Sequence, residues 1–138
     1  MRETYTMEKL IISEERTGSA NPVSVITLRG TIETTNASGL EEMLERIVNE
    51  KCYRIVVDLG GVNYISSAGW GIFISEIKRI RRNSGDIKLA AMKTEVREVF
   101  DLLEFGNILK PFERTSDAIR DFEFASDAGA HGGPPGRR

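Results

Sequence analysis

The sequence is poor in the residue types that build covalent cross-links and catalytic sites, since its 138 residues include one cysteine, one histidine and one tryptophan. The single cysteine, Cys52, excludes an internal disulfide and a zinc site made of several cysteines, and it fits a reducing compartment. We expect Cys52 to be a small buried side chain at the entrance of a strand. The single histidine, His131, lies in a stretch rich in glycine and proline, so a serine–histidine pair for nucleophilic catalysis has little support.

The sequence also lacks long apolar runs and a strong charge of either sign. No run approaches the ~18 apolar residues of a membrane-spanning helix, and residues 1–6 lack the apolar core of a signal peptide. With 19 basic and 21 acidic residues, the net charge is −2, which gives no broad positive field for a nucleic-acid duplex. The basic cluster at residues 78–82 leaves a nucleic-acid patch as an alternative, but cations there also suit the negative end of a helix dipole. We therefore expect a cytoplasmic protein that binds neither membranes nor nucleic acids.

Motifs for catalysis and for cofactors are missing as well. The sequence contains no Gly-x-Ser-x-Gly elbow and no Gly-x-x-x-x-Gly-Lys phosphate loop. It has no spaced set of histidine, cysteine and carboxylate residues that would bind a metal. The sequence thus predicts a protein that is not an enzyme and that uses no metal and no cofactor.

The pattern of apolar residues predicts alternating strands and helices. Two strands are joined by a polar stretch that suits a loose antiparallel hairpin, and three consecutive apolar residues at 55–57 are typical of a central strand covered on both faces. The expected order is β-β-α-β-α-β-α-α, with strands at residues 10–12, 23–28, 55–57 and 87–92 and helices that begin near residues 37, 67, 94 and 115. We therefore expect an α/β fold in which four helices pack on a mixed sheet of four or five strands.

The segment 55–71 is the most informative part of the sequence, because an apolar strand runs through a glycine-bearing loop into Ser66 and Ser67, which begin a helix. The first backbone N–H groups of a helix have no intrahelical partner, and the helix dipole is positive there. A serine hydroxyl at this point caps the helix, and a phosphoserine can be held by the same N–H groups. From the residues alone, Ser67 is either a helix cap or a phosphorylation site.

Two motifs carry a resemblance to a known family. One strand leads into Gly30-Thr31-Ile32-Glu33-Thr34-Thr35-Asn36, and a strand that ends in Asp58 is followed by Tyr64-Ile65-Ser66-Ser67-Ala68-Gly69. Over residues 8–124 the chain resembles STAS domains, and in particular the small bacterial anti-sigma factor antagonists. The resemblance implies a mixed sheet with packed helices, in agreement with the apolar pattern. It leaves residues 1–7 as a flexible N-terminus and residues 125–138 as a disordered tail.

The resemblance also implies a function. In the family a serine two residues before the glycine of this motif is phosphorylated, and counting back from Gly69 gives Ser67. Ser66 stands where the family often has aspartate, which makes Ser66 the alternative acceptor. The implied partner is an anti-sigma factor that is also a serine kinase. Phosphorylation switches the binding off, a serine phosphatase reverses it, and the resulting control of a sigma factor regulates transcription.

The expected partner surface combines two loops and one helix. In the family the matching surface docks on the kinase, and here it comprises Glu33, Thr35, Asn36, Ser66, Ser67, Gly69 and Ile72. Around the helix Ile72 falls almost opposite the apolar stripe of Trp70, so we expect Ile72 to be an exposed apolar contact. A tryptophan at position 70 could stack on a ligand, but Trp70 belongs to the apolar stripe of the helix, which favours a place in the core. Asp58 and Glu33 have structural alternatives, as a turn residue and as a hydrogen-bonding loop residue.

A second function within the same family stays open. In this alternative the domain is a scaffold subunit of a stress-signalling or lipid-transport complex, and the serine is not modified. Size-exclusion chromatography separates the two, because an antagonist is expected to be a monomer or a weak homodimer and a scaffold is expected to form large particles.

Overall fold

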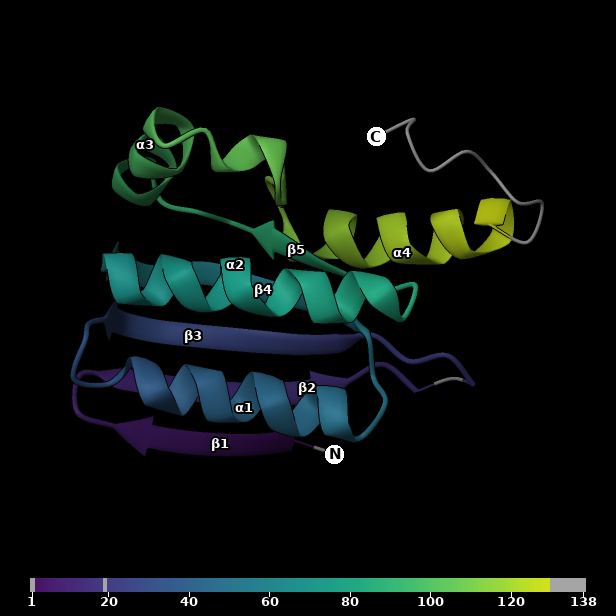
Figure 1. Ribbon diagram of the computed structural model, residues 1–138, viewed down its shortest axis with the longest axis horizontal. Helices are drawn as coiled ribbons and strands as arrows, with labels where there is room; N and C mark the ends of the chain where they lie inside the picture. The colour runs from purple at the N-terminus through teal and green to yellow at the C-terminus, as the bar shows by residue number, and fades with distance from the viewer. Residues whose placement is uncertain (1, 19, 130–138) are drawn as a thin grey trace.

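A six-stranded mixed sheet with helices packed on it forms the centre of the computed structural model, which describes residues 2–18 and 20–129 (Figure 1). The strands are β1 (Arg2–Met7), β2 (Leu10–Arg16), β3 (Ser24–Ile32), β4 (Arg54–Ile65), β5 (Asp86–Ala90) and β6 (Lys110–Phe112). The helices are α1 (Ala37–Asn49), α2 (Ser67–Arg82), α3 (Thr94–Leu102) and α4 (Thr115–Gly129), with a short 3-10 helix, η1 (Phe105–Asn107), after α3. The predicted α/β class is confirmed, with six strands instead of four or five.

The strands lie in the sheet in the same order as in the sequence. β1, β2 and β3 pair antiparallel, whereas β3, β4, β5 and β6 pair parallel. β4 is 12 residues long, and its register against β3 shifts between Thr27 and Arg29 and again between Gly30 and Thr31. Because β3 and β4 are parallel neighbours, their carboxyl ends lie side by side at one edge of the sheet.

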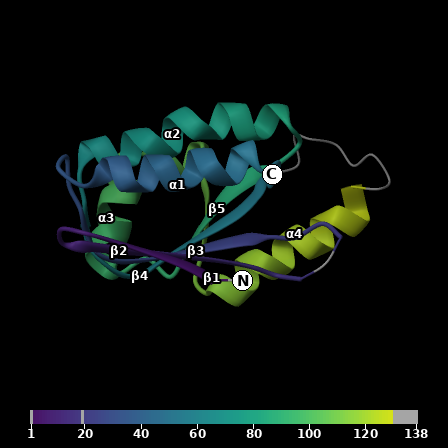
Figure 2. The ribbon, with the colours of Figure 1, turned by 90° about the horizontal axis from the view of Figure 1, so that it is seen from below.

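Helices cover the two faces of the sheet differently (Figure 2). α1 and α2 lie side by side over one face, and α4 packs against the other face. Val57 of β4 belongs to the main core cluster with residues of α1 and α2, whereas Val56 belongs to a smaller cluster with Ala118 and Phe122 of α4. Residues 55–57 are all 0% exposed, which confirms that this strand is covered on both faces.

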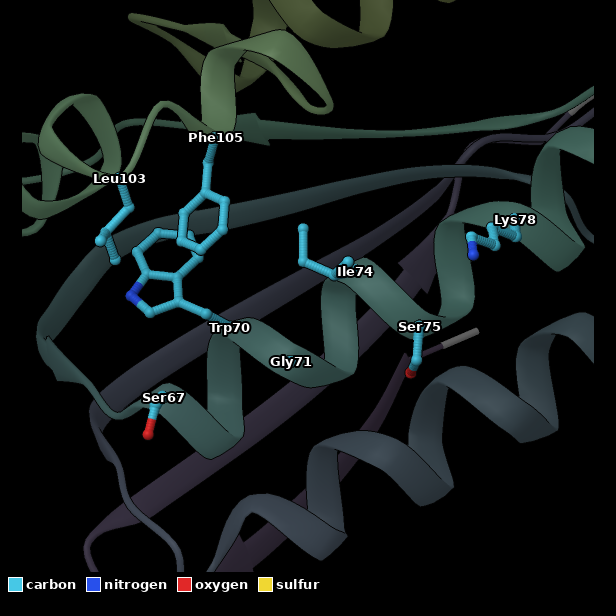
Figure 3. A pocket seen from close by; sticks show the side chains of 8 residues that line it. All are labelled: Ser67, Trp70, Gly71, Ile74, Ser75, Lys78, Leu103 and Phe105. Atoms are coloured by element: carbon cyan, nitrogen blue, oxygen red, sulfur yellow. The ribbon is translucent and has the colours of Figure 1, made fainter.

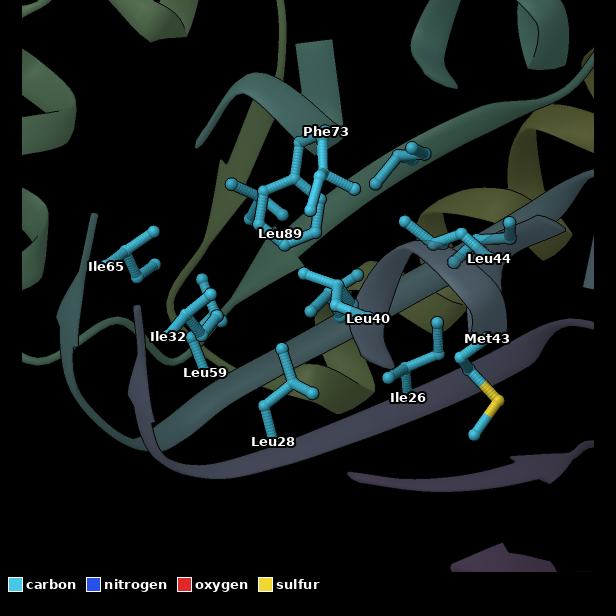
Figure 4. Packing of buried hydrophobic residues seen from close by; sticks show 14 of the residues in the cluster. Ile26, Leu28, Ile32, Leu40, Met43, Leu44, Leu59, Ile65, Phe73 and Leu89 are labelled. Atoms are coloured by element: carbon cyan, nitrogen blue, oxygen red, sulfur yellow. The ribbon is translucent and has the colours of Figure 1, made fainter. Parts of the chain in front are cut away.

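The main core fills the space between the sheet and the helices α1 and α2 (Figure 4). Apolar residues recur along α1 at helical spacing, so one stripe of that helix faces the sheet. Each large aliphatic side chain removed from water contributes roughly 1.5–3 kcal/mol, so this layer contributes much of the stability. Its fully buried members include Ile26, Leu28, Ile32, Leu40, Met43, Leu44, Leu59, Phe73 and Leu89.

The single cysteine also belongs to this core. Cys52 is 5% exposed and lies just before β4, which confirms the small buried side chain expected at a strand entrance. Among the helices that the structure describes, none combines the length and the apolar character needed to cross a membrane.

Both ends of the chain carry more regular structure than the sequence suggested. Arg2–Met7 form β1 and pair with β2 along their whole length, so the predicted flexibility of the N-terminal segment is wrong for residues 2–7. β1 is an edge strand with only Met7 partly buried, and its polar residues therefore give no apolar alternation to detect. α4 continues through residues 125–129 of the predicted tail, and residues 130–138 lie outside the described part of the chain.

A buried lysine holds α4 against the sheet. Lys88 of β5 is 4% exposed, and its Nζ lies 2.9 Å from Oδ2 of Asp121 on α4. The same Nζ lies 4.4 Å from the centre of the Phe122 ring, an arrangement in which the aromatic face attracts the cation. Arg54 of β4 donates a hydrogen bond to the Phe122 carbonyl. α4 is therefore held by charged contacts as well as by apolar packing.

Candidate functional site around Ser67

The carboxyl ends of β3 and β4 bring the two loops of the predicted site together (Figure 1). Ile32 of β3 pairs with Ile65 of β4, and the Ser66 N–H donates to the Ile32 carbonyl at 2.8 Å. The loop at residues 33–36 and the first turn of α2 therefore leave the sheet at the same edge. This is the arrangement expected from the order of the strands.

The two serines at the start of α2 have different environments. Ser66 is the N-cap residue and is 8% exposed, and its Oγ accepts the Gly69 N–H at 3.2 Å. Ser67 is the first residue of the helix and is exposed to solvent. The N–H groups of Ser67 and Ala68 have no carbonyl one turn earlier to accept them within the helix. The cap is thus supplied by Ser66, and the Ser67 hydroxyl stands at the positive end of α2.

β4 reaches the site without the loop that the sequence predicted. The strand continues from residues 55–57 through the glycines to Ile65, with the register shifts against β3 taking up the extra length. Within it, Asp58 accepts the Gly60 N–H at 2.8 Å through Oδ1. This bond gives Asp58 a structural role in the irregular backbone of β4, although the residue lies inside the strand and not in the turn that the sequence predicted.

Asn36 fixes the shape of the first loop from inside. The residue is 1% exposed, and its side chain accepts the Glu33 N–H at 2.8 Å while donating to the Glu8 and Thr31 carbonyls at 2.8 and 3.0 Å. Asn36 is the N-cap residue of α1, but its side chain makes no capping bond to that helix. The exposure expected of it at the partner surface is wrong, because its amide is buried and hydrogen-bonded within the fold.

Two residues of this loop remain accessible, and one neighbour joins them. Thr35 is exposed. Glu33 is partly exposed, accepts a hydrogen bond from the Thr31 hydroxyl at 3.1 Å, and lies 3.9 Å from the Lys9 ammonium. Lys9 sits in the turn between β1 and β2 with a φ of 66°, and the Thr31 N–H donates to its carbonyl. No pattern in the sequence points to Lys9, because the pairing of β1 with β2 is what places this turn at the site.

Gly69 allows α2 to approach the sheet closely. A Cβ at this position would lie 2.7 Å from Cγ2 of Ile32 and 2.9 Å from Cγ2 of Ile65. Both methyl groups are attached to branched Cβ atoms, so neither can move away as the end of a flexible side chain could. Gly69 is buried, so it sets the position of Ser67 and does not present a surface of its own.

The predicted exposure of Ile72 is wrong. Ile72 is 9% exposed and belongs to the main core, because α2 packs along α1 as well as on the sheet. The same contact buries Glu76, which is 7% exposed and whose Oε1 has no hydrogen-bond partner within the described residues. Burial raises the pKa of Glu76, and the charges of Glu45 and Glu41 on α1 raise it further against the opposing effect of Arg79. Ile72 therefore plays no direct part in the candidate surface.

Trp70 is a core residue, as its stripe predicted, and is 3% exposed. Its ring centre lies 5.0 Å from that of Phe105 and 5.9 Å from that of Phe100. One edge of Trp70 and the side chain of Ser67 line the same hollow beside α2 (Figure 3). Leu103 lines it too. It is 52% exposed because α3 ends at Leu102 and the chain turns away there.

Metal chemistry finds no support in this region. Among residues 2–18 and 20–129, no group of three or more histidine, cysteine or carboxylate side chains is placed to hold a metal ion. The only histidine, His131, lies outside the described residues.

The mixed sheet and the two adjoining loops match one known domain. A family model described as the STAS domain matches residues 15–118. The chain belongs to the STAS domain family. This STAS protein is 37% identical over 101 residues to the putative anti-sigma factor antagonist BtrV of Bordetella bronchiseptica, and the match covers 73% of this chain and 87% of that protein.

Solved structures are similar in fold. The STAS protein matches an anti-sigma factor antagonist from Mycobacterium paratuberculosis with a TM-score of 0.69 and 20% identity, covering 80% of this chain and 92% of that chain. It matches the Bacillus cell fate determinant SpoIIAA in its phosphorylated form with a TM-score of 0.60 and 14% identity, covering 79% and 98%. At these identities the likeness shows the fold alone. The family suggested by the sequence motifs is confirmed.

Proposed function

We propose that this STAS protein is an anti-sigma factor antagonist of the bacterial cytoplasm, which binds an anti-sigma factor kinase and loses that binding when Ser67 is phosphorylated. The observation that carries the proposal is the exposed Ser67 hydroxyl at the first residue of α2, beside a Ser66 hydroxyl that is buried and engaged. The name of the relative at 37% identity supports the class of partner.

The choice of Ser67 over Ser66 follows from what a kinase needs. A kinase must reach the hydroxyl oxygen and leave a phosphate in its place. Ser66 Oγ is buried and accepts the Gly69 N–H, so phosphorylation there would remove the cap of α2 and force a charged group into a packed junction. A phosphate on Ser67 would lie in solvent, next to the positive end of the helix.

The same placement explains how a small modification could end binding. A phosphoserine adds about −1.5 to −2 charges near neutral pH. If Ser67 lies inside the docked surface, that charge loses its water, and an unpaired buried charge costs several kcal/mol. A penalty of ~3–4 kcal/mol weakens binding roughly several hundredfold, since each 1.4 kcal/mol is about tenfold. The fold of the antagonist itself does not need to change.

The proposed docking surface is smaller than the sequence suggested. Ser67, Thr35 and the exposed part of Glu33 can touch a partner directly. The buried members of the predicted set, Asn36 and Gly69, act by holding the two loops in place. The proposal gives this chain no catalytic step, metal or cofactor, because the kinase supplies the phosphoryl transfer and a serine phosphatase removes the group.

The proposal is tested by incubating the protein with each purified anti-sigma factor kinase of its own genome and Mg-ATP, followed by mass spectrometry of the intact protein and of its peptides. We expect the mass of one phosphoryl group on Ser67, present in the Ser66→Ala variant and absent in the Ser67→Ala variant. If no kinase modifies the protein under conditions in which a known pair reacts, the phospho-switch is wrong. Large particles in size-exclusion chromatography would then favour the scaffold alternative.

A further inference from the structure

A groove of about 560 Å³ runs along α2, with Ser67 at one end and Lys78 at the other (Figure 3). These two residues are 11 positions apart, so the groove follows roughly 16 Å of helix. Leu103 and Phe105 form the wall that faces α2, and the Trp70 side chain reaches from α2 toward this wall. The α2 side of the groove is lined by Ser67, Gly71, Ile74, Ser75 and Lys78.

Gly71, in the middle of this helix side, has no role in the fold that would require a glycine. A Cβ at Gly71 would meet nothing within 4 Å, whereas a Cβ at Gly69 would collide with two isoleucines. Glycine inside a helix lowers helix stability relative to alanine, and its missing side chain lets another molecule come close to the backbone. Within the described residues nothing comes close to Gly71. The open side of this glycine therefore points to an occupant from outside.

The wall that faces α2 is unusually apolar for a surface. Leu103, which lines the groove, is 52% exposed, and Phe105 lines the groove beside it. An exposed apolar wall of this kind marks a surface that another molecule covers. Leu103 and Ser67 line the same groove, so a molecule that fills the groove also reaches Ser67.

The charges of the groove restrict the chemistry of its occupant. Lys78 is exposed, pairs with no carboxylate within the described residues, and is the only charged residue of the lining. The complement of this groove is therefore a segment with apolar side chains along most of its length and a carboxylate at the end that meets Lys78.

We infer that the groove receives such a segment from the same anti-sigma factor partner that docks over Ser67. This inference rests on the proposed function, and it adds α2 residues up to Lys78 and the Leu103 wall to the docking surface. Large apolar side chains of the partner fill the space over Gly71 between Ile74 and Leu103. Because Ser67 lies at one end of the groove, a phosphate on it lies next to the bound segment. Its charge therefore weakens the binding of that segment as well as the contact at Ser67 itself.

The test fills the groove and measures binding to purified anti-sigma factor kinases of the same genome by calorimetry, with a non-hydrolysable ATP analogue. In Gly71→Leu a side chain occupies the groove, and the helix keeps its fold because the Cβ meets open space. The matched control is Gly18→Leu, since Gly18 also faces open space but lies between β2 and β3, at the opposite end of the sheet. We expect Gly71→Leu to weaken binding at least tenfold, Lys78→Glu to weaken it at least fivefold, and Gly18→Leu to bind within twofold of the wild type.

Wild-type affinity in Gly71→Leu, with circular dichroism and melting temperature retained, would overturn the inference and leave the Ser67 proposal standing if Ser67→Asp still abolishes binding. If no kinase binds the wild type, the proposed function fails and this inference fails with it. A wild-type homodimer that Gly71→Leu converts to monomer, at unchanged kinase affinity, would assign the groove to a second copy of the chain and also overturn the inference.

A second measurement avoids any substitution. Trp70 is the only tryptophan of the chain and lines the groove. Protein labelled with 5-fluorotryptophan therefore gives one fluorine resonance, which we expect to shift when the kinase is added. An unchanged resonance at saturating kinase would contradict occupation of the groove.

Discussion

Two glycines of α2, two positions apart, are expected to respond to alanine in opposite directions. At Gly71 the added methyl group faces open space, so only the higher helix propensity of alanine affects stability. Gly71→Ala should therefore raise the free energy of unfolding by about 1 kcal/mol. For a domain of this size that raises the melting temperature by about 3 °C. At Gly69 the methyl group would lie 2.7 Å and 2.9 Å from the Cγ2 atoms of Ile32 and Ile65. Both neighbours are buried β-branched residues that cannot yield without moving a strand.

Overpacking of this kind costs about 1–3 kcal/mol, and the gain in helix preference is smaller in the first turn, so Gly69→Ala should lose about 1–2 kcal/mol. The two variants should therefore differ by about 2–3 kcal/mol in urea unfolding followed by circular dichroism. Two-state unfolding with an unchanged dependence on urea concentration is the condition for the comparison. If Gly71→Ala destabilises the protein as much as Gly69→Ala, the side of α2 that carries Ser67 is packed inside the fold, and the account of the groove is wrong.

Three further substitutions test other parts of the account. Ser66→Ala removes the hydroxyl that caps α2 and should cost about 1 kcal/mol of stability, whereas Ser67→Ala should change it little; equal losses would contradict the assignment of the cap. Because the pKa of Glu76 is raised in the folded protein, the folded protein loses stability as the pH rises from the ordinary glutamate pKa through the raised value. Glu76→Gln should therefore stabilise the protein more at about pH 7 than at about pH 4. A gain in stability that is independent of pH would refute this. Lys88→Met leaves Asp121 without its closest cation, so the free energy of unfolding measured in urea should fall by about 2 kcal/mol. Amide exchange in α4 should become faster. Unaltered exchange there would show that the pair does not hold the helix.

The sequence predicts elements well where local chemistry decides them. α2 begins at Ser67 as predicted, because a serine cap precedes it, and it ends at Arg82, just before Asn83-Ser84-Gly85. β1 and β6 escape prediction because neither carries a pattern of its own. β1 is a polar edge strand that exists through its pairing with β2, and β6 has three residues, one of them Pro111, paired with β5.

The site was predictable in position but not in the exposure of its residues. The carboxyl ends of neighbouring parallel strands had to bring the two loops together, so Ser67 and Thr35 fall where the sequence places them. The exposure of Ile72 could not be read from one helix, because α1 covers the side that a single sheet contact would leave open. Asn36 was misplaced for a related reason, since the Glu8 carbonyl that it reaches comes from a turn made by β1.

The central claim is that Ser67 is the switch between binding and release, and calorimetry with the kinase that modifies the protein tests it most directly. The unmodified protein and the protein phosphorylated on Ser67 are titrated separately into the kinase with a non-hydrolysable ATP analogue, with Ser67→Ala as the control for loss of the hydroxyl alone. The account predicts that phosphorylation weakens binding roughly several hundredfold, equivalent to ~3–4 kcal/mol, and that Ser67→Ala binds like the unmodified protein. Equal affinity of the unmodified and phosphorylated proteins would contradict it.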